Sequence, residues 1–278
     1  MGSASIATPP ATRRSVTRDG VALAYAATDT DTGVGTPPFI LVHGLCDDLD
    51  VMAPLAHRLA GDHQVVRVDL RGHGASDAPE GGQMYTVETL AADVAAVCEH
   101  LGVDQAVVVG HSLGGAVAVQ LAATLPDLVA GVVLLEGALL FRREVLDSVG
   151  PLFAAIRTPA WREALHGFVD GGFIATDDAV VRAAAHARVD GLAQHAMVSI
   201  FDAAGRWDAE PAIRAVGVPM LYVEAGSGLT DLDRFTELCP QLQIGRTVGV
   251  GHNQMLATPA QAEAMIDRFV EVSVGGVA

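Results

Sequence analysis

The chain has 278 residues, half of them hydrophobic, which is enough for one domain with a large core and no stabilising cross-links. Its formal net charge of −16 argues against binding to nucleic acid or to an anionic membrane surface, because both would repel it. The cysteines Cys46, Cys98 and Cys239 form no metal-binding or disulfide pattern, and residues 1–12 lack the apolar centre of a signal peptide. No apolar run approaches the roughly 20 residues of a membrane span. These features predict a cytoplasmic protein.

Short hydrophobic strands alternate with helices along the first half of the chain. Residues 1–13 are expected to be a disordered lead-in, and residues 15–26 are expected to form a strand pair that turns at Asp19-Gly20. Continuous apolar runs then indicate strands buried on both faces, with amphipathic helices between them. Strands are predicted at residues 39–42, 64–69, 106–110 and 128–136, and helices at residues 51–59, at residues 86–101 and after residue 112.

The pattern changes after Glu136. Residues 138–208 read as almost wholly helical, with helices near 143–156, 159–169 and 177–203, and strands resume at 218–223 and near 247–248. A helix from Pro259 to about Val272 closes the chain. Alternating buried strands and helices predict an α/β fold with a mostly parallel sheet covered on both faces. The sequence therefore predicts a core of residues 14–137 and 209–278, and a helical cap of residues 138–208 over the C-terminal ends of the strands.

One serine lies at a sharp strand-to-helix turn. The turn reads Gly110-His111-Ser112-Leu113-Gly114, which is the Gly-x-Ser-x-Gly pattern that lifts a serine hydroxyl clear of a sheet. Glycine is needed on either side because a side chain at those positions would crowd so tight a turn. His111 is interpreted as structural. The five-residue pattern is short. The strand predicted before it and the helix predicted after it strengthen its interpretation as a nucleophile turn.

Four segments together resemble the α/β-hydrolase family. They are His43-Gly44 after a strand, Asp69-Leu70-Arg71-Gly72-His73-Gly74-Ala75-Ser76, Gly110-His111-Ser112-Leu113-Gly114-Gly115, and Gly249-Val250-Gly251-His252 before the last helix. They fall in the order and at the spacing of that family, and the resemblance covers nearly the whole chain. It implies the α/β-hydrolase fold with a cap insertion, and a catalytic serine that precedes its acid and its histidine in the chain.

The resemblance also implies roles for individual residues. Ser112 is the predicted nucleophile and His252 the base that activates it, because a free hydroxyl is too weak a nucleophile at neutral pH. The backbone N–H groups of Leu113 and Leu45 are predicted to form an oxyanion hole for the tetrahedral intermediate. His43 is expected to order the loop after it rather than to transfer protons.

The acid is where the sequence departs from most relatives. An aspartate usually follows the strand that here ends at Val223, but this turn reads Glu224-Ala225-Gly226-Ser227-Gly228. Glu136 stands at the end of the strand after the nucleophile helix, a position used for the acid in haloalkane dehalogenases and in fungal zearalenone lactonases. Glu136 is therefore the preferred acid, expected to orient His252, with Glu224 and Asp231 as alternatives.

These residues predict a hydrolase that cleaves a carboxylic ester or lactone of a small apolar molecule through an acyl-enzyme on Ser112. Aromatic and methionine side chains of the cap are expected to pack its helices, and a minority to shape the substrate pocket; they are Phe153, Trp161, Phe168, Phe173, Met197, Phe201 and Trp207.

No phosphate-binding loop, dinucleotide-binding glycine pattern or metal-ligand cluster appears in the sequence, so neither cofactor nor metal is predicted. The chain is expected to act as a monomer or homodimer.

Three other functions stay open. A carbon–carbon bond hydrolase would use the same triad. A cofactor-free dioxygenase of this fold carries a Gly-x-Cys-x-Asp-like loop that Gly44-Leu45-Cys46-Asp47-Asp48 resembles in shifted form, and places its acid after the same strand as Glu136. A non-catalytic receptor would use the pocket only to bind a small molecule.

Overall fold

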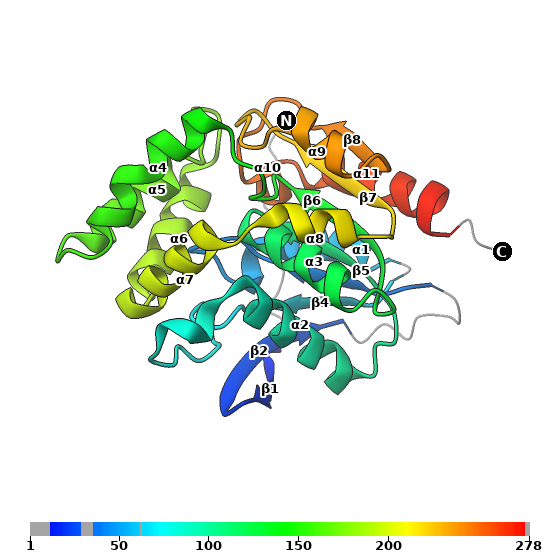
Figure 1. Cartoon of the computed structure of the whole chain (residues 1–278), viewed down its shortest axis with the longest axis horizontal. Helices are drawn as coiled ribbons and strands as arrows, with labels where there is room; N and C mark the ends of the chain where they lie inside the picture. Colours follow the sequence, from blue (N-terminus) through cyan, green and yellow to red (C-terminus); the bar gives the residue numbers. More distant parts are fainter. Residues whose placement is uncertain (1–11, 29–35, 62, 276–278) are drawn as a thin grey trace.

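A single eight-stranded sheet runs through the protein, whose computed structural model describes residues 12–28, 36–61 and 63–275 (Figure 1). The strand order is β1-β2-β4-β3-β5-β6-β7-β8. β1 and β2 run antiparallel to their neighbours, and every other pair is parallel. The strands are β1 (Arg14–Arg18), β2 (Val21–Ala27), β3 (Phe39–Val42), β4 (Val65–Val68), β5 (Ala106–His111), β6 (Val129–Leu135), β7 (Met220–Glu224) and β8 (Leu242–Arg246). The predicted mostly parallel α/β sheet is confirmed.

Helices connect the parallel strands and cover the sheet. The α-helices are α1 (Ala53–Leu59), α2 (Val87–Leu101), α3 (Leu113–Thr124), α4 (Arg143–Ala155), α5 (Trp161–Asp170), α6 (Ala179–Asp190), α7 (Gln194–Arg206), α8 (Ala209–Ala215), α9 (Leu232–Leu238), α10 (Gln254–Ala257) and α11 (Pro259–Phe269). Short 3-10 turns lie at Leu49–Met52 and Gly82–Tyr85, and a π-helical turn at Val270–Val274 extends α11. In the described part of the chain, none of the helices combines the length and the apolar character needed to cross a membrane.

The central strands are buried on both faces, as their continuous apolar sequences predict. In β3, Ile40 and Val42 pack into a hydrophobic cluster shared with α2, α3 and α8, whereas Phe39 and Leu41 pack into a second cluster shared with α1 and α11. Successive side chains of a strand point to opposite faces, so an unbroken apolar run supplies both clusters at once. The C-terminal ends of these strands are thereby held rigidly at one edge of the sheet.

Most predicted elements appear within a few residues of their expected bounds. The hairpin turns at Asp19-Gly20, where both residues have positive φ, and the Thr86 side chain caps α2 by accepting a hydrogen bond from the Thr89 N–H. Residues 1–11 of the predicted lead-in lie outside the described residues. Arg13, at the end of that lead-in, forms an ion pair with Asp50.

Two predictions of secondary structure were wrong. The single helix expected over residues 177–203 is two helices, because α6 ends at Asp190 and the backbone is extended at Ala193, before α7 begins at Gln194. The sequence predicts the last strand near residues 247–248, but β8 ends at Arg246 and Val248 is 76% exposed. β8 is an edge strand with mixed burial, so its sequence lacks the continuous apolar run that marks the central strands.

The α4–α7 segment lies to one side of the sheet, drawn in green to yellow in Figure 1. Its interior is aromatic: the Phe201 ring meets those of Phe153 and Phe168 edge to face. Near its end, the Trp207 indole N–H donates to the Gln120 side chain of α3, which ties the segment to the sheet-covering helices. This is the stretch that the sequence predicts to be a cap.

Candidate active site

Ser112 sits at the turn between β5 and α3 in a conformation that only a constrained backbone adopts. Its φ of 49° and ψ of −115° lie outside the regions that are comfortable for an L-residue. The Ser112 N–H donates to the Leu135 carbonyl at 3.2 Å, and its carbonyl accepts from the N–H groups of Gly115 and Ala138, each at 2.9 Å. The neighbouring strand β6 and the loop after it therefore hold the strained residue from both sides.

The flanking glycines are required by packing. A Cβ at Gly110 would overlap the Gly114 carbonyl and lie 2.6 Å from the Gly115 nitrogen. At Gly114 it would overlap the Val42 carbonyl oxygen and lie 2.7 Å from that of His43. These neighbours are backbone atoms, which cannot rotate away, so the turn accepts no side chain at either position.

We expect Gly114→Ala to lower the free energy of unfolding by about 3 kcal/mol or more, because the added methyl group must displace β3 or α3. Gly167→Ala is the matched control: a Cβ there meets nothing within 4 Å, so the substitution in the middle of α5 should stabilise by about 1 kcal/mol. Urea unfolding followed by circular dichroism measures both. Equal unfolding midpoints for the two variants would contradict the packing argument.

His252 lies in the loop between β8 and α10, and hydrogen bonds hold both its backbone N–H and its backbone carbonyl. Its N–H donates to the Gly172 carbonyl of the α4–α7 segment at 3.1 Å, and its own carbonyl lies 3.1 Å from Nε2 of His111. The rings of His111 and His252 lie 4.5 Å apart between centroids. His252 is thus placed beside the turn that carries Ser112, with 20% of its side chain exposed.

Glu136 is the carboxylate that faces His252. Its Oε2 lies 3.4 Å from His252 Nδ1 and also accepts a short hydrogen bond from the Ser227 hydroxyl, while Oε1 accepts from the Ala225 N–H at 2.6 Å. The side chain is fully buried at the end of β6, where Glu136, like Ser112, has a positive φ of 49°. Both oxygens are therefore directed by hydrogen bonds, and one of them points at the imidazole.

The two alternative acids are engaged elsewhere. Glu224 Oε2 accepts from Arg246 Nε at 2.7 Å across β7 and β8. Asp231 caps the N-terminus of α9 by accepting from the Arg234 N–H at 3.0 Å. Of the three carboxylates that the sequence singles out, only Glu136 is brought to His252.

The loop of residues 43–48 is shaped by two histidines, His43 and His73. The Leu70 N–H donates to His43 Nε2 at 3.0 Å, so the ring proton is on Nδ1 and donates to the Gly44 carbonyl at 2.7 Å. A trans peptide points its C=O and N–H in opposite directions. By fixing the Gly44 carbonyl, His43 fixes the opposite direction of the Leu45 N–H. The Leu113 N–H is the first of α3. It has no acceptor within the helix and points out of the helix N-terminus.

His73 holds the next residue of the same loop. Its Nε2 accepts from the Cys46 N–H at 3.3 Å, and Cys46 has a positive φ of 64°. Burial, with a smaller contribution from His43, lowers the pKa of His73 to about 3. The ring therefore stays neutral and keeps its acceptor for Cys46 throughout the physiological range.

This buried histidine should make the fold sensitive to acid. Its pKa is about 3 when folded and about 6.5 when unfolded, so below pH 6.5 the unfolded chain takes up a proton that the folded chain refuses. The free energy of unfolding should thus fall between pH 7 and pH 5 by about 2 kcal/mol more in the wild type than in His73→Gln, whose amide oxygen retains an acceptor for Cys46. Urea titrations at both pH values measure this difference, and parallel pH dependence of the two proteins would refute it.

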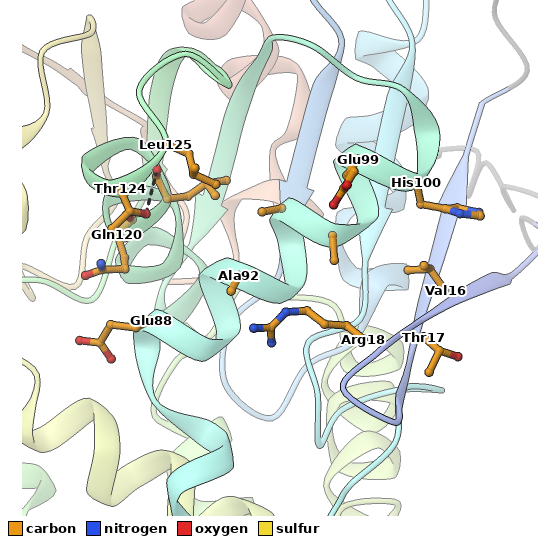
Figure 2. Close-up of a pocket in the computed structure, with 13 residues that line it drawn as sticks. Val16, Thr17, Arg18, Glu88, Ala92, Glu99, His100, Gln120, Thr124 and Leu125 are labelled. Carbon is orange, nitrogen blue, oxygen red and sulfur yellow. Dashed lines mark hydrogen bonds between the residues drawn. The ribbon is translucent and has the colours of Figure 1, made fainter.

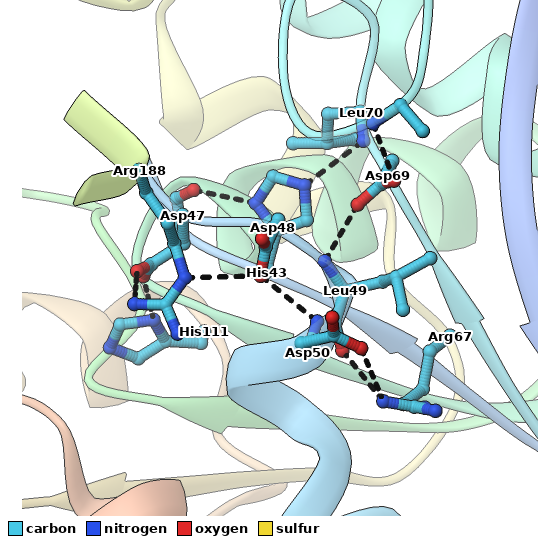
Figure 3. A network of polar contacts seen from close by, with 12 residues as sticks. His43, Asp47, Asp48, Leu49, Asp50, Arg67, Asp69, Leu70, His111 and Arg188 are labelled. Carbon is cyan, nitrogen blue, oxygen red and sulfur yellow. Dashed lines mark hydrogen bonds and ion pairs between the residues drawn. The ribbon is translucent and has the colours of Figure 1, made fainter. Parts of the chain in front are cut away.

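A charged cluster that sequence patterns do not reveal lies beside this loop (Figure 3). Arg188 of α6 donates through Nε to Asp48 at 3.1 Å and lies 3.9 Å from Asp47, whose other oxygen is 3.7 Å from His111 Nδ1. Burial raises the pKa of Asp47, partly offset by Arg188, and burial together with His252 lowers that of His111 well below its usual value. Arg188 and Asp48 are 140 residues apart, so no local motif could have linked them.

Ser112 does not line either of two surface pockets of the described residues. A surface pocket of about 700 Å³ lies between β1, α2 and α3, and the labelled residues of Figure 2, from Val16 to Leu125, include none of the predicted site residues. A second pocket of about 380 Å³ adjoins the charged cluster and is lined by Asp47, Asp48 and Arg188 among others. In the described residues, no group of three or more His, Cys, Asp or Glu side chains is arranged to hold a metal ion.

Comparison with known proteins agrees with this architecture. A sequence model of the family described as alpha/beta hydrolase fold matches residues 37–162. A 2-(acetamidomethylene)succinate hydrolase of Mesorhizobium japonicum is 30% identical over 253 residues, covering 84% of this chain and 88% of that protein. Among solved structures, Est816, described as an N-acyl homoserine lactone degrading enzyme, is 25% identical, with a TM-score of 0.77 over 92% of this chain and all of that one.

An enol-lactonase from Burkholderia xenovorans has the same fold, with a TM-score of 0.80 and 24% identity over 93% of this chain and all of that one. The long match to the Mesorhizobium hydrolase, the match to the family model and the sheet order all point the same way. The chain belongs to the α/β-hydrolase family and is a hydrolase of that fold.

Proposed function

We propose that this hydrolase cleaves a carboxylic ester or lactone of a small, largely apolar molecule through an acyl-enzyme on Ser112. The observation that carries the proposal is the 3.4 Å contact of His252 Nδ1 with the buried Glu136 carboxylate, next to a serine held in a strained turn. A serine, a base and an acid that orients the base are the parts that acyl transfer requires.

In the proposed reaction, His252 Nε2 takes the hydroxyl proton of Ser112 while Oγ bonds to the substrate carbonyl carbon. Glu136 remains ionised and stabilises the imidazolium. The N–H groups of Leu45 and Leu113 donate to the oxyanion, and the imidazolium then protonates the leaving alkoxide. Water, deprotonated by His252, then attacks the acyl carbon, and the imidazolium returns the proton to Ser112 Oγ as the acyl–oxygen bond breaks, which releases the carboxylic acid and the free serine.

The α4–α7 segment supports the proposal as a cap. It reaches the base directly, since the Gly172 carbonyl accepts the His252 N–H, and its interior is rich in aromatic side chains. We propose that it covers the acyl group of the substrate and determines which esters or lactones are accepted. Est816, which is described as degrading a lactone, makes lactones the first substrates to test.

The test combines a substrate screen with covalent labelling. The purified protein is expected to hydrolyse members of a panel of p-nitrophenyl acyl esters and N-acyl and aliphatic lactones. A fluorophosphonate probe is expected to label Ser112, as located by mass spectrometry of the peptides. Absence of both hydrolysis and labelling would overturn the proposal; release of a product by carbon–carbon cleavage would keep the triad and change the substrate class.

A further inference from the structure

Arg188 connects the α4–α7 segment to the 43–48 loop through a largely desolvated ion-pair cluster (Figure 3). Its Nε donates to Asp48 Oδ1 at 3.1 Å, and its Nη1 lies 3.9 Å from Asp47 Oδ1. The side chains of Arg188, Asp47 and Asp48 are 16%, 13% and 18% exposed. Water therefore competes weakly for these contacts, and their geometry is held more firmly than that of surface ion pairs.

The loop that Arg188 reaches has a strained conformation and needs support. Cys46 has the left-handed φ of 64°, which is costly for a residue with a Cβ and persists only when the surroundings over-determine it. His43 and His73 support the loop before and at this residue. After it, Asp48 Oδ1 accepts both the Asp50 N–H at 3.0 Å and the Arg188 guanidinium. Among the ion pairs described for this loop, those of Arg188 come from the α4–α7 segment.

We propose that Arg188 is a positioning residue that holds the Leu45 N–H in place as an oxyanion donor by anchoring Asp47 and Asp48. This inference rests on the proposed function, which gives Leu45 that role. It makes catalytic competence depend on the α4–α7 segment being docked. With α6 docked, polar contacts hold the loop on both sides of Cys46. Without α6, only the contacts from the core remain.

A direct contact between Arg188 and substrate fits the structure less well. Its Nη1 is enclosed, with no hydrogen-bond partner and almost no accessible surface, so a substrate group could reach it only by displacing Asp47. Asp47 and Asp48 also lie beside the Arg188 guanidinium, so its positive charge is already paired with carboxylates rather than free to attract an anion. The geometry therefore favours anchoring of the loop over recognition of the substrate.

Two measurements on Arg188→Met and Arg188→Lys test the proposal, with Arg182→Met as the matched control. Arg182 lies on the same helix but pairs with Asp170 inside the α4–α7 segment. In Arg188→Met, kcat for the best ester of the screen should fall about tenfold to a hundredfold, less than for loss of a donor itself, with KM within about threefold. A trifluoromethyl ketone, whose adduct on Ser112 carries an oxyanion, should bind more weakly in proportion to the loss in kcat/KM.

Backbone hydrogen exchange measures how firmly Arg188 anchors the loop, independently of activity. Peptides covering residues 43–50 should exchange about tenfold faster in Arg188→Met than in the wild type, with the remaining core peptides unchanged. Arg188→Lys should restore part of both effects, because lysine can still pair with one aspartate, and Arg182→Met should change neither.

The outcomes separate this inference from the proposed function. Unchanged exchange over residues 43–50, or a kcat within twofold of wild type, would overturn the positioning role. A rise in KM alone, confined to anionic esters, would also overturn it and make Arg188 a substrate contact. If the wild type hydrolyses nothing, the proposed function and the role at an oxyanion both fail, whereas faster exchange would still identify Arg188 as the anchor of the loop.

Discussion

Exchange of Ser112 for alanine is expected to lower kcat by about four to six orders of magnitude, because the remaining groups have no oxygen nucleophile to activate. The backbone turn should survive, since alanine makes the same hydrogen bonds to Leu135, Gly115 and Ala138 through its main chain. Steady-state hydrolysis of the best substrate from the screen, with circular dichroism to verify folding, measures the effect. Loss of fluorophosphonate labelling should accompany it.

The same variant separates the rival functions. A cofactor-free dioxygenase would consume oxygen with a hydroxyquinolone-type substrate, and that consumption would persist in Ser112→Ala. A receptor would bind its ligand equally well with and without the serine hydroxyl, and the wild type would resist the probe. Retention of more than about a tenth of the hydrolytic rate in Ser112→Ala would show that another group attacks the substrate.

Replacement of Glu136 by glutamine is the second substitution with a large expected effect, a fall in kcat of about 10⁴-fold. The amide nearly matches the carboxylate in shape, but it can present an N–H to His252 Nδ1 and so favour the wrong tautomer of the imidazole. It also removes the negative charge that would stabilise the imidazolium. The measurement is kcat/KM with the screened ester, together with the rate of fluorophosphonate labelling at Ser112.

Glu224→Gln and Asp231→Asn are the controls, because they alter the alternative acids. Each variant keeps a side-chain oxygen for its local contact, with Arg246 or as the cap of α9, and loses only the negative charge. Each is therefore expected to keep kcat within about threefold and to lose less than about 1 kcal/mol of stability. An inactive Glu224 or Asp231 variant beside an active Glu136→Gln would reassign the acid.

The central fold was predictable because its signals are local. A four-residue apolar run such as Phe39–Val42, bounded by turn-forming residues, is typical of a buried strand and too short for a helix. Thr86 marks the start of α2 by its capping side chain. The break between α6 and α7 was harder to predict, because one glycine in a helical pattern costs only about 1 kcal/mol and packing decides whether the helix ends there. β8 was misplaced because an edge strand needs no continuous apolar face.

For the site, the sequence by itself determined the candidates whose geometry is local. Ser112 is defined by a turn that tolerates only glycine around it. His252 and Leu45 are implied by the resemblance of their short loops to those of the α/β-hydrolase family. The candidate acid lay open among three carboxylates, since nothing local distinguishes them. The departure from the usual aspartate after β7 has a structural counterpart in Ser227, whose hydroxyl binds Glu136.

The tertiary structure decided which groups meet. Glu136 and His252 are 116 residues apart, and Arg188 and Asp48 are 140 apart, so their contacts exist only because parallel strands end at one edge of the sheet and α6 folds over it. Side-chain contacts of a few ångströms across separate loops depend on strand register and helix docking. Those quantities are set by the packing of the whole core, and no single segment of sequence contains them.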